Sequence, residues 1–230
     1  MRIEVPENIS RPFIYACMGF GSNSPDERSV ALVEECSKLV LDAAEPRLIY
    51  KEFNMTDVEV FLEGEDIKEH LADADRCVMM ALTLGSQIDR LIRRYEITDM
   101  VKAMAIDACA SSLVEDLCDR FSGELAERCR TEGSYTTSRF SPGYGDLPLN
   151  AQKVFEHLLE MHRAIGLSHS KEFLLTPRKS VTAIIGICKS GKKSVDCESQ
   201  KIGFTKPYAC EICKNYENCA FRLKGAHCGR

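Results

Sequence analysis

The sequence has no long hydrophobic run, no apolar N-terminal segment and no excess of positive charge, and each absence excludes a class of protein. No stretch reaches the 18 or so uninterrupted apolar residues that a membrane helix requires. The first residues, 1–6, lack the apolar core of a secretory signal. The 30 basic and 35 acidic side chains give a net charge of −5, which argues against a general nucleic-acid surface. We therefore expect a cytoplasmic protein whose partners are neither membranes nor nucleic acids.

Motifs of common enzyme classes are also missing. There is no G-x-S-x-G nucleophile elbow and no G-x-x-x-x-G-K-[ST] phosphate loop. The turn Gly19-Phe20-Gly21 has Ser24 where a dinucleotide-binding fingerprint has its third glycine, so a tight strand-to-helix turn is favoured. The five histidines include no His-x-x-x-His pair for catalytic zinc.

What is present is an ordinary globular composition with many cysteines. A chain of 230 residues corresponds to one large domain or to one domain plus an appendage, and it can bury a core without disulfides. The 12 cysteines are too few for a disulfide scaffold. In a reducing compartment they are expected to be buried hydrophobes, metal ligands or redox groups. Six lie in apolar or helical contexts and are predicted to pack: Cys17, Cys36, Cys77, Cys109, Cys118 and Cys129.

Strands and helices are predicted without regular alternation, which favours an α+β domain over a doubly wound parallel sheet. Strands are expected at 13–18, 47–55, 77–84, 172–175 and 181–188, the last two forming a hairpin around 176–179. Helices are expected from about 24 to 44 and at 66–72, 87–95, 99–121 and 151–165, with 134–145 as a loop. We predict one module over 1–190, followed by a linker and a small cysteine-bearing tail over 191–230.

Two of these helices carry N-terminal signals. Ser24, Pro25 and Glu27 form a predicted capping box, and Asn150 is expected to cap the helix that Gly166 closes.

A polar stripe runs along the helix predicted at 99–121. Asp107, Ser111, Glu115 and Asp119 recur every four residues and therefore share one face. Such a stripe is usually solvated helix surface. The alternative is a carboxylate that faces a ligand amine or hydroxyl, and Glu115, flanked by Val114 and Leu117, is the best candidate for it.

The segment 139–148 is a more distinctive candidate. It has one arginine, two glycines, a tyrosine and two prolines in ten residues, which indicates a stiff loop with exposed backbone. Arg139 is able to grip a carboxylate through two hydrogen bonds, and Tyr144 offers a ring face and a hydroxyl. From the residues alone, a binding loop and a structural turn are equally supported.

These residues carry a resemblance to a known family. The pattern R-x-x-P-G-Y-x-x-x-P, formed by Arg139, Pro142, Gly143, Tyr144 and Pro148, resembles the S-adenosylmethionine-binding loop of the activation domain of cobalamin-dependent methionine synthase. Segment 174–182, Leu-Leu-Thr-Pro-Arg-Lys-Ser-Val-Thr, is similar to that family's apolar-x-P-x-x-S-V-[ST] hairpin, and 99–105 is similar to the start of its long central helix. The resemblance covers roughly residues 77–188.

The resemblance implies an α+β fold with a mixed or antiparallel sheet, and a role in methionine biosynthesis. That domain presents S-adenosylmethionine to a cobalamin (vitamin B12) held by a neighbouring domain, where reduction and methyl transfer restore methylcobalamin from inactive cob(II)alamin. By this likeness Arg139 binds the methionine carboxylate, the backbone around Ser141 and Gly143 holds the ligand, and Tyr144 lines the pocket. The protein's contribution is then proximity and orientation, while cobalt supplies the nucleophile.

The chain also departs from the family. Phe140, Ser141 and Gly145 replace the family's Pro, Ala and Pro, and no corrinoid-binding D-x-H-x-x-G is present. The chain is therefore expected to act in trans on methionine synthase or a related corrinoid methyltransferase, as its reactivation component. A flavodoxin or a ferredoxin is a candidate electron donor.

The predicted tail contains C-x2-C-x5-C, formed by Cys210, Cys213 and Cys219. Cys228 is taken as the fourth metal ligand, with Cys188, Cys197 and His227 as alternatives. Four such ligands suit tetrahedral zinc or an iron–sulfur cluster. The bland alternative is a set of free thiols.

Two functions from different classes follow. The first is an S-adenosylmethionine-binding protein that supports reductive methylation of cob(II)alamin on a separate methyltransferase. The alternative is a metal or iron–sulfur binding protein of activation-like fold that serves electron transfer or assembly. A fold relative that has lost the ligand is the third and blandest interpretation.

Overall fold

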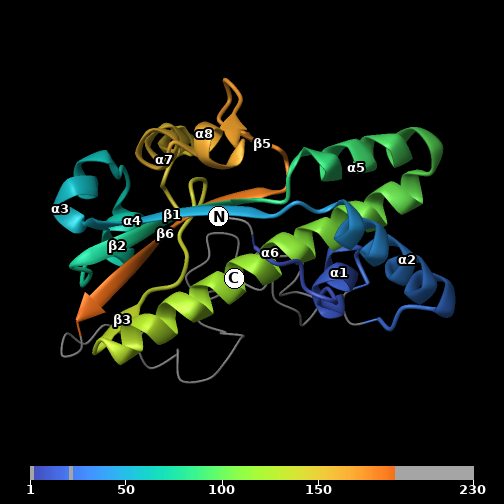
Figure 1. Ribbon diagram of the computed structural model, residues 1–230, viewed down its shortest axis with the longest axis horizontal. Coiled ribbons are helices and arrows are strands. Elements are labelled where there is room, and N and C mark those ends of the chain that lie inside the picture. Colours follow the sequence, from blue (N-terminus) through green and yellow to red (C-terminus); the bar gives the residue numbers. More distant parts are fainter. Residues whose placement is uncertain (1–2, 21–22, 190–230) are drawn as a thin grey trace.

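The computed structural model describes residues 3–20 and 23–189, and a four-stranded antiparallel sheet lies at its centre (Figure 1). The strand order is β1-β2-β6-β3, and every neighbouring pair is antiparallel. The strands are β1 (Arg47–Asn54), β2 (Arg76–Thr83), β3 (Ser134–Thr136) and β6 (Ser180–Lys189). A separate two-stranded sheet pairs β4 (Ser168–His169) with β5 (Leu175–Thr176). This confirms the predicted α+β class with an antiparallel sheet.

The two central strands are buried on both faces, because helices cover the sheet on both sides. Along β2, seven consecutive residues from Cys77 to Thr83 are buried, which explains the continuous apolar run. One core lies between the sheet and helices α1, α2, α5 and α6. A second core lies between the other face and α3, α4, α7 and α8. The helices are α1 (Arg11–Cys17), α2 (Glu27–Ala43), α3 (Met55–Val58), α4 (Glu65–His70), α5 (Ser86–Thr98), α6 (Met100–Thr131), α7 (Gln152–Leu159) and α8 (Met161–Ile165), with 3-10 turns at Glu59–Phe61 and Leu149–Ala151.

Helix α6 contributes more buried residues to the first core than any other helix. It has 32 residues, so it is about 48 Å long and runs beneath the sheet for most of the molecule's length (Figure 1). The side chain of Asp99 caps it by accepting a hydrogen bond from the backbone nitrogen of Lys102 at 3.0 Å. The helix continues ten residues past the predicted end at Phe121, because Leu125 and Cys129 keep the four-residue apolar spacing and are buried.

Several predicted elements are corrected. Residues 13–17 lie in helix α1 rather than in a strand, with Met18 as its C-cap, Pro12 in the first turn and Ile14 buried. Helix α2 begins two residues later than the predicted capping box, because Asp26, not Ser24, accepts the hydrogen bond from the backbone nitrogen of Ser29 at 2.8 Å.

The region 149–189 needs a second set of corrections. Asn150 does not cap a helix: a 3-10 turn precedes α7, and Glu160 at φ +53° divides the predicted helix into α7 and α8. Gly166 does close α8 in the left-handed conformation. Strands β5 and β6 do not form a hairpin, because β5 pairs with β4 and β6 pairs with β2 and β3. The predicted loop 134–145 contains the short strand β3.

The cysteines and the membrane prediction are tested only in part. Five of the six cysteines predicted to pack are buried, and Cys17, at the end of α1, is exposed instead. Within 3–20 and 23–189, no helix is both long enough and apolar enough to cross a membrane.

Candidate functional site

The segment 139–148 begins as an irregular continuation of the sheet and then turns sharply. Phe140 exchanges two backbone hydrogen bonds with Ile184 of β6, at 2.9 and 2.8 Å. The turn that follows is closed by hydrogen bonds from the Tyr144 nitrogen to the Ser141 carbonyl at 3.0 Å and from the Gly143 nitrogen to the Leu147 carbonyl at 2.8 Å. The loop is therefore anchored to β6 and has internal hydrogen bonds that limit its movement.

The far half of the loop is fastened to helix α4. The carboxylate of Asp146 accepts hydrogen bonds from the backbone nitrogens of Glu65 at 2.7 Å and Asp66 at 3.1 Å, so it caps α4 from a distant part of the sequence. Gly145 has φ +52°, and a Cβ there would lie 2.9 Å from the Cβ of Asp66. Glycine at 145, where the family has proline, thus permits this close approach.

Arg139 points to the opposite side of the sheet from Phe140, toward α6. Its Nη2 donates to Glu115 Oε2 at 2.9 Å, and its Nη1 donates to Asp119 Oδ1 at 2.7 Å and to Ser122 Oγ at 3.3 Å. The Arg139 side chain is 15% exposed, and the two carboxylates are about one-third exposed. Burial alone would lower the pKa of Arg139, but the Cys118 thiol, Asp119 and Glu115 outweigh it, so the net shift of the pKa is upward.

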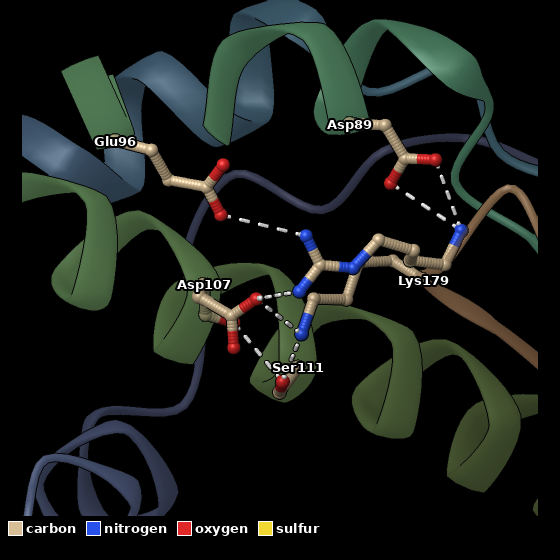
Figure 2. Close-up of polar contacts among 6 residues, drawn as sticks. Asp89, Glu96, Asp107, Ser111 and Lys179 are labelled. Atoms are coloured by element: carbon tan, nitrogen blue, oxygen red, sulfur yellow. Dashed lines mark hydrogen bonds and ion pairs between the residues drawn. The ribbon is translucent and has the colours of Figure 1, made fainter. Parts of the chain in front are cut away.

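A second basic group, Lys179, contacts Asp107 and Ser111 of α6 (Figure 2). Lys179 Nζ lies 2.9 Å from Asp107 Oδ1 and donates to Ser111 Oγ at 2.9 Å. The neighbouring Arg178 guanidinium lies 3.8 Å from Asp107 and 3.6 Å from Glu96, and its backbone nitrogen donates to both carboxylate oxygens of Asp89. These contacts join the start of β6 to α5 and α6.

The polar stripe predicted on α6 is therefore neither free surface nor an isolated acidic patch. From one end to the other it consists of Asp107 and Ser111 under Lys179, then Glu115 and Asp119 under Arg139. Around Arg139 one positive charge faces two negative charges, so the local balance is one negative charge in excess. Such an arrangement suits a ligand that carries a carboxylate for the guanidinium and a cationic group for Glu115 or Asp119.

Each predicted binding residue can now be placed. Arg139 and Glu115, which are 24 positions apart, are in direct contact. Ser141, Gly143 and Tyr144 form the turn that follows Phe140, and the Tyr144 ring packs edge-on against Phe140, whose side chain lies on the opposite side of the sheet from that of Arg139, with centroids 6.1 Å apart.

Three contributors were not singled out from the sequence: Asp119 as a direct partner of Arg139, Ser122 and Lys179. The four-residue spacing places Asp119 on the same helix face as Glu115, so a group that contacts Glu115 could be expected to contact Asp119 as well. Lys179 occupies a variable position of the family's hairpin pattern, and only the fold brings it to α6. Cys17 lies beside the same stripe; the residue is exposed, but partial desolvation of its thiol raises the thiol pKa, and Lys179 opposes that shift.

Two surface hollows lie away from the loop. One, of about 360 Å³, is bordered by 6–10 of the N-terminal segment and by Asp116, Leu117 and Arg120 of α6. The other, of about 450 Å³, lies between the end of α2 and α5. Neither is lined by residues 139–148.

The predicted metal ligands cannot be placed, because Cys210, Cys213, Cys219 and Cys228 lie outside the described residues. Cys197 and His227 lie outside them as well, whereas Cys188 is buried in β6. Within 3–20 and 23–189, no group of three or more His, Cys, Asp or Glu side chains is arranged to hold a metal ion.

Comparison with known proteins gives the fold and no close relative. No protein-family model and no curated protein matches the sequence. Among solved structures, the chain is similar to a crystal structure of the MetH reactivation domain bound to AdoHcy, with a TM-score of 0.62 and 16% sequence identity. The match covers 84% of this chain and 79% of that one. The chain therefore has the fold of that domain.

Proposed function

We propose that this chain binds S-adenosylmethionine at the loop 139–148 and supports reductive methylation of cob(II)alamin on a separate corrinoid protein. One observation carries the proposal: the R-x-x-P-G-Y arginine lies against Glu115 and Asp119 in a domain of the MetH reactivation fold. The structural neighbour holds AdoHcy, the product that S-adenosylmethionine leaves after methyl transfer, which supports an adenosyl ligand.

The charges around Arg139 fit this ligand class. The methionine end of S-adenosylmethionine carries a carboxylate and an ammonium, and the sulfonium adds a second positive charge. When the ligand carboxylate pairs with Arg139, the ligand ammonium pairs with Glu115 or Asp119. Arg139, Glu115 and Asp119 then each still face a group of opposite charge. The ligand therefore replaces ion pairs rather than creating a buried charge, which limits the desolvation cost.

The proposed reaction divides the work between this chain and its partners. A one-electron donor of the flavodoxin or ferredoxin class reduces cob(II)alamin to cob(I)alamin. The cobalt electron pair then attacks the methyl carbon, the carbon–sulfur bond breaks, and its electron pair stays on sulfur. The products are methylcobalamin and S-adenosylhomocysteine. This chain's residues bind and orient the sulfonium compound, which is catalysis by proximity.

Isothermal titration calorimetry with S-adenosylmethionine and S-adenosylhomocysteine tests the binding step. We expect both to bind wild type, and Arg139→Ala to weaken binding about 10- to 100-fold, as expected for losing hydrogen bonds to a charged group. Arg130→Ala is the matched control, because Arg130 forms its ion pair with Glu127 on the exposed end of α6. Absence of binding by wild type, or equal affinities for Arg139→Ala and Arg130→Ala, would refute the proposal.

A further inference from the structure

Four large apolar side chains are exposed together at the corner between α5 and α6. Ile97, near the end of α5, is 88% exposed, and Met100, Val101 and Met104, in the first turns of α6, are 59%, 63% and 60% exposed. We call these four residues the corner patch. In Figure 1 this corner lies beyond the end of the sheet, on the far side of the molecule from α3. Contiguous exposed apolar residues of this kind mark interaction sites more often than isolated ones do.

The corner patch shares a helix face with the candidate site. Met100 and Met104 precede Asp107 and Ser111 by seven positions each, which is two helical turns. Glu115 continues the same row. At 1.5 Å per residue, Met104 lies about 16 Å along the helix axis from Glu115. One protein surface of ordinary interface size is wide enough to cover both the corner patch and the loop 139–148.

Exposed arginines flank the corner patch on α5. Arg93 lies one turn before Ile97, next to Arg94, and Arg90 is one turn further back. Among the residues that the structure describes, none of the three is within ion-pair distance of a carboxylate. By contrast, Glu96 is engaged by Arg178, and Asp99 caps α6. The patch therefore has an apolar centre and a basic flank.

We propose that the corner patch is the docking surface for the corrinoid-bearing partner, whose complementary face has an apolar centre and an acidic rim. This inference rests on the proposed function, because that function requires a second protein to bring cobalt to the loop. A partner seated on the corner patch extends along the exposed face of α6 toward Arg139. The basic flank selects acidic partners and accelerates encounter, and the apolar side chains contribute most of the affinity.

The test uses the full chain and a cobalamin-loaded cobalamin-binding module of a cobalamin-dependent methionine synthase as the probe. Binding is measured by biolayer interferometry at low and physiological salt. We expect Met104→Glu to weaken binding at least tenfold, and Arg93→Glu/Arg94→Glu to weaken it and to reduce its dependence on salt. Val60→Glu is the matched control, because Val60 is 72% exposed near α3, at the other end of the molecule.

Calorimetry with S-adenosylmethionine on the same variants separates this inference from the proposed function. Unchanged ligand binding by Met104→Glu, together with weakened module binding, supports the docking surface. If wild type does not bind S-adenosylmethionine, the proposed function is refuted. The docking surface is still supported in that case if Met104→Glu, but not Val60→Glu, weakens binding of the module. Equal module binding by Met104→Glu and Val60→Glu, or no module binding at all, overturns the inference. So does a wild-type dimer that Met104→Glu converts to monomer, since a second copy then covers the patch.

Discussion

Replacing Arg139 with methionine tests whether the cluster on α6 is a coupled unit. Methionine keeps most of the apolar length of the side chain but removes every donor to Glu115, Asp119 and Ser122. A buried hydrogen bond to a charged group is worth about 1.5–3 kcal/mol, but exposed ion pairs are worth about 1 kcal/mol or less. Arg139 is mostly buried while its two carboxylates are one-third exposed, so each contact lies between these limits.

We therefore expect Arg139→Met to lower the free energy of unfolding by about 2 kcal/mol. For a domain of this size that corresponds to a fall in Tm of about 4–8 °C. Part of the loss arises because Glu115 and Asp119, one helical turn apart, then repel each other. Removing one of these carboxylates should relieve that part, so Glu115→Gln should destabilise the Arg139→Met background less than it destabilises wild type.

Urea unfolding of wild type, Arg139→Met, Glu115→Gln and the double variant forms a double-mutant cycle. We expect a coupling energy of about 1 kcal/mol between Arg139 and Glu115. Lys51→Met serves as the control, because the Lys51 ammonium donates to the backbone carbonyl of Leu158, away from α6, and should show no coupling with Glu115. A coupling energy below about 0.3 kcal/mol, or a loss from Arg139→Met below about 0.5 kcal/mol, would refute the view that these residues act together.

Two further predictions concern a carboxyl group and a glycine. Burial raises the pKa of Asp116 above its ordinary 3.8, so the folded state holds this proton to higher pH than the unfolded state and wild type loses stability as pH rises through that interval. Asp116→Asn still accepts a hydrogen bond from the Ser10 nitrogen and should remove this loss. The free energies of unfolding of wild type and Asp116→Asn, measured in urea from pH 3 to 7, should therefore depend differently on pH. Parallel pH profiles for the two proteins would contradict the reasoning. Gly145→Ala should lower the free energy of unfolding by about 1–2 kcal/mol, because Gly145 has a φ of +52° and a Cβ there would crowd Asp66. Gly123→Ala should not destabilise the protein, because a Cβ at Gly123 meets nothing within 4 Å. Equal unfolding midpoints for the two variants would contradict this.

Local patterns were sufficient for the parts of the fold whose burial follows from one element alone. Strand β2 is buried on both faces, so its continuous apolar run predicts a buried strand. The apolar residues of α5 and of the start of α6 have regular helical spacing, which predicts helices there. The apolar run 13–18 was ambiguous between strand and helix. The packing of Ile14 and the hydrogen bond from the Ser10 nitrogen to Asp116 of α6 decide it, and neither is visible in sequence.

Strand pairing was the other limit. Strand β6 follows β5 closely in sequence, which suggested a hairpin, but its 180–187 segment pairs with β2, about 100 positions earlier. Only the two-sided core explains this choice, because β6 is buried from Thr182 to Cys188 and a hairpin with β5 would leave that run uncovered. The same long-range pairing sets the position of Lys179, which immediately precedes β6, so its contact with Asp107 could not be predicted either.

Two separate sequence arguments lead to Arg139 and to Glu115, and the structure brings these two residues into contact. The loop pattern identified the arginine, and helical spacing identified the carboxylates, but neither indicated that Arg139 forms ion pairs with both Glu115 and Asp119. This pairing has a functional consequence. An arginine without a partner would be costly to keep mostly buried, whereas one held by two partly exposed carboxylates is already desolvated and fixed in position. Under the proposed function, the excess negative charge favours a cationic amino acid ligand over a simple carboxylate, because only the former leaves the cluster neutral or nearly so.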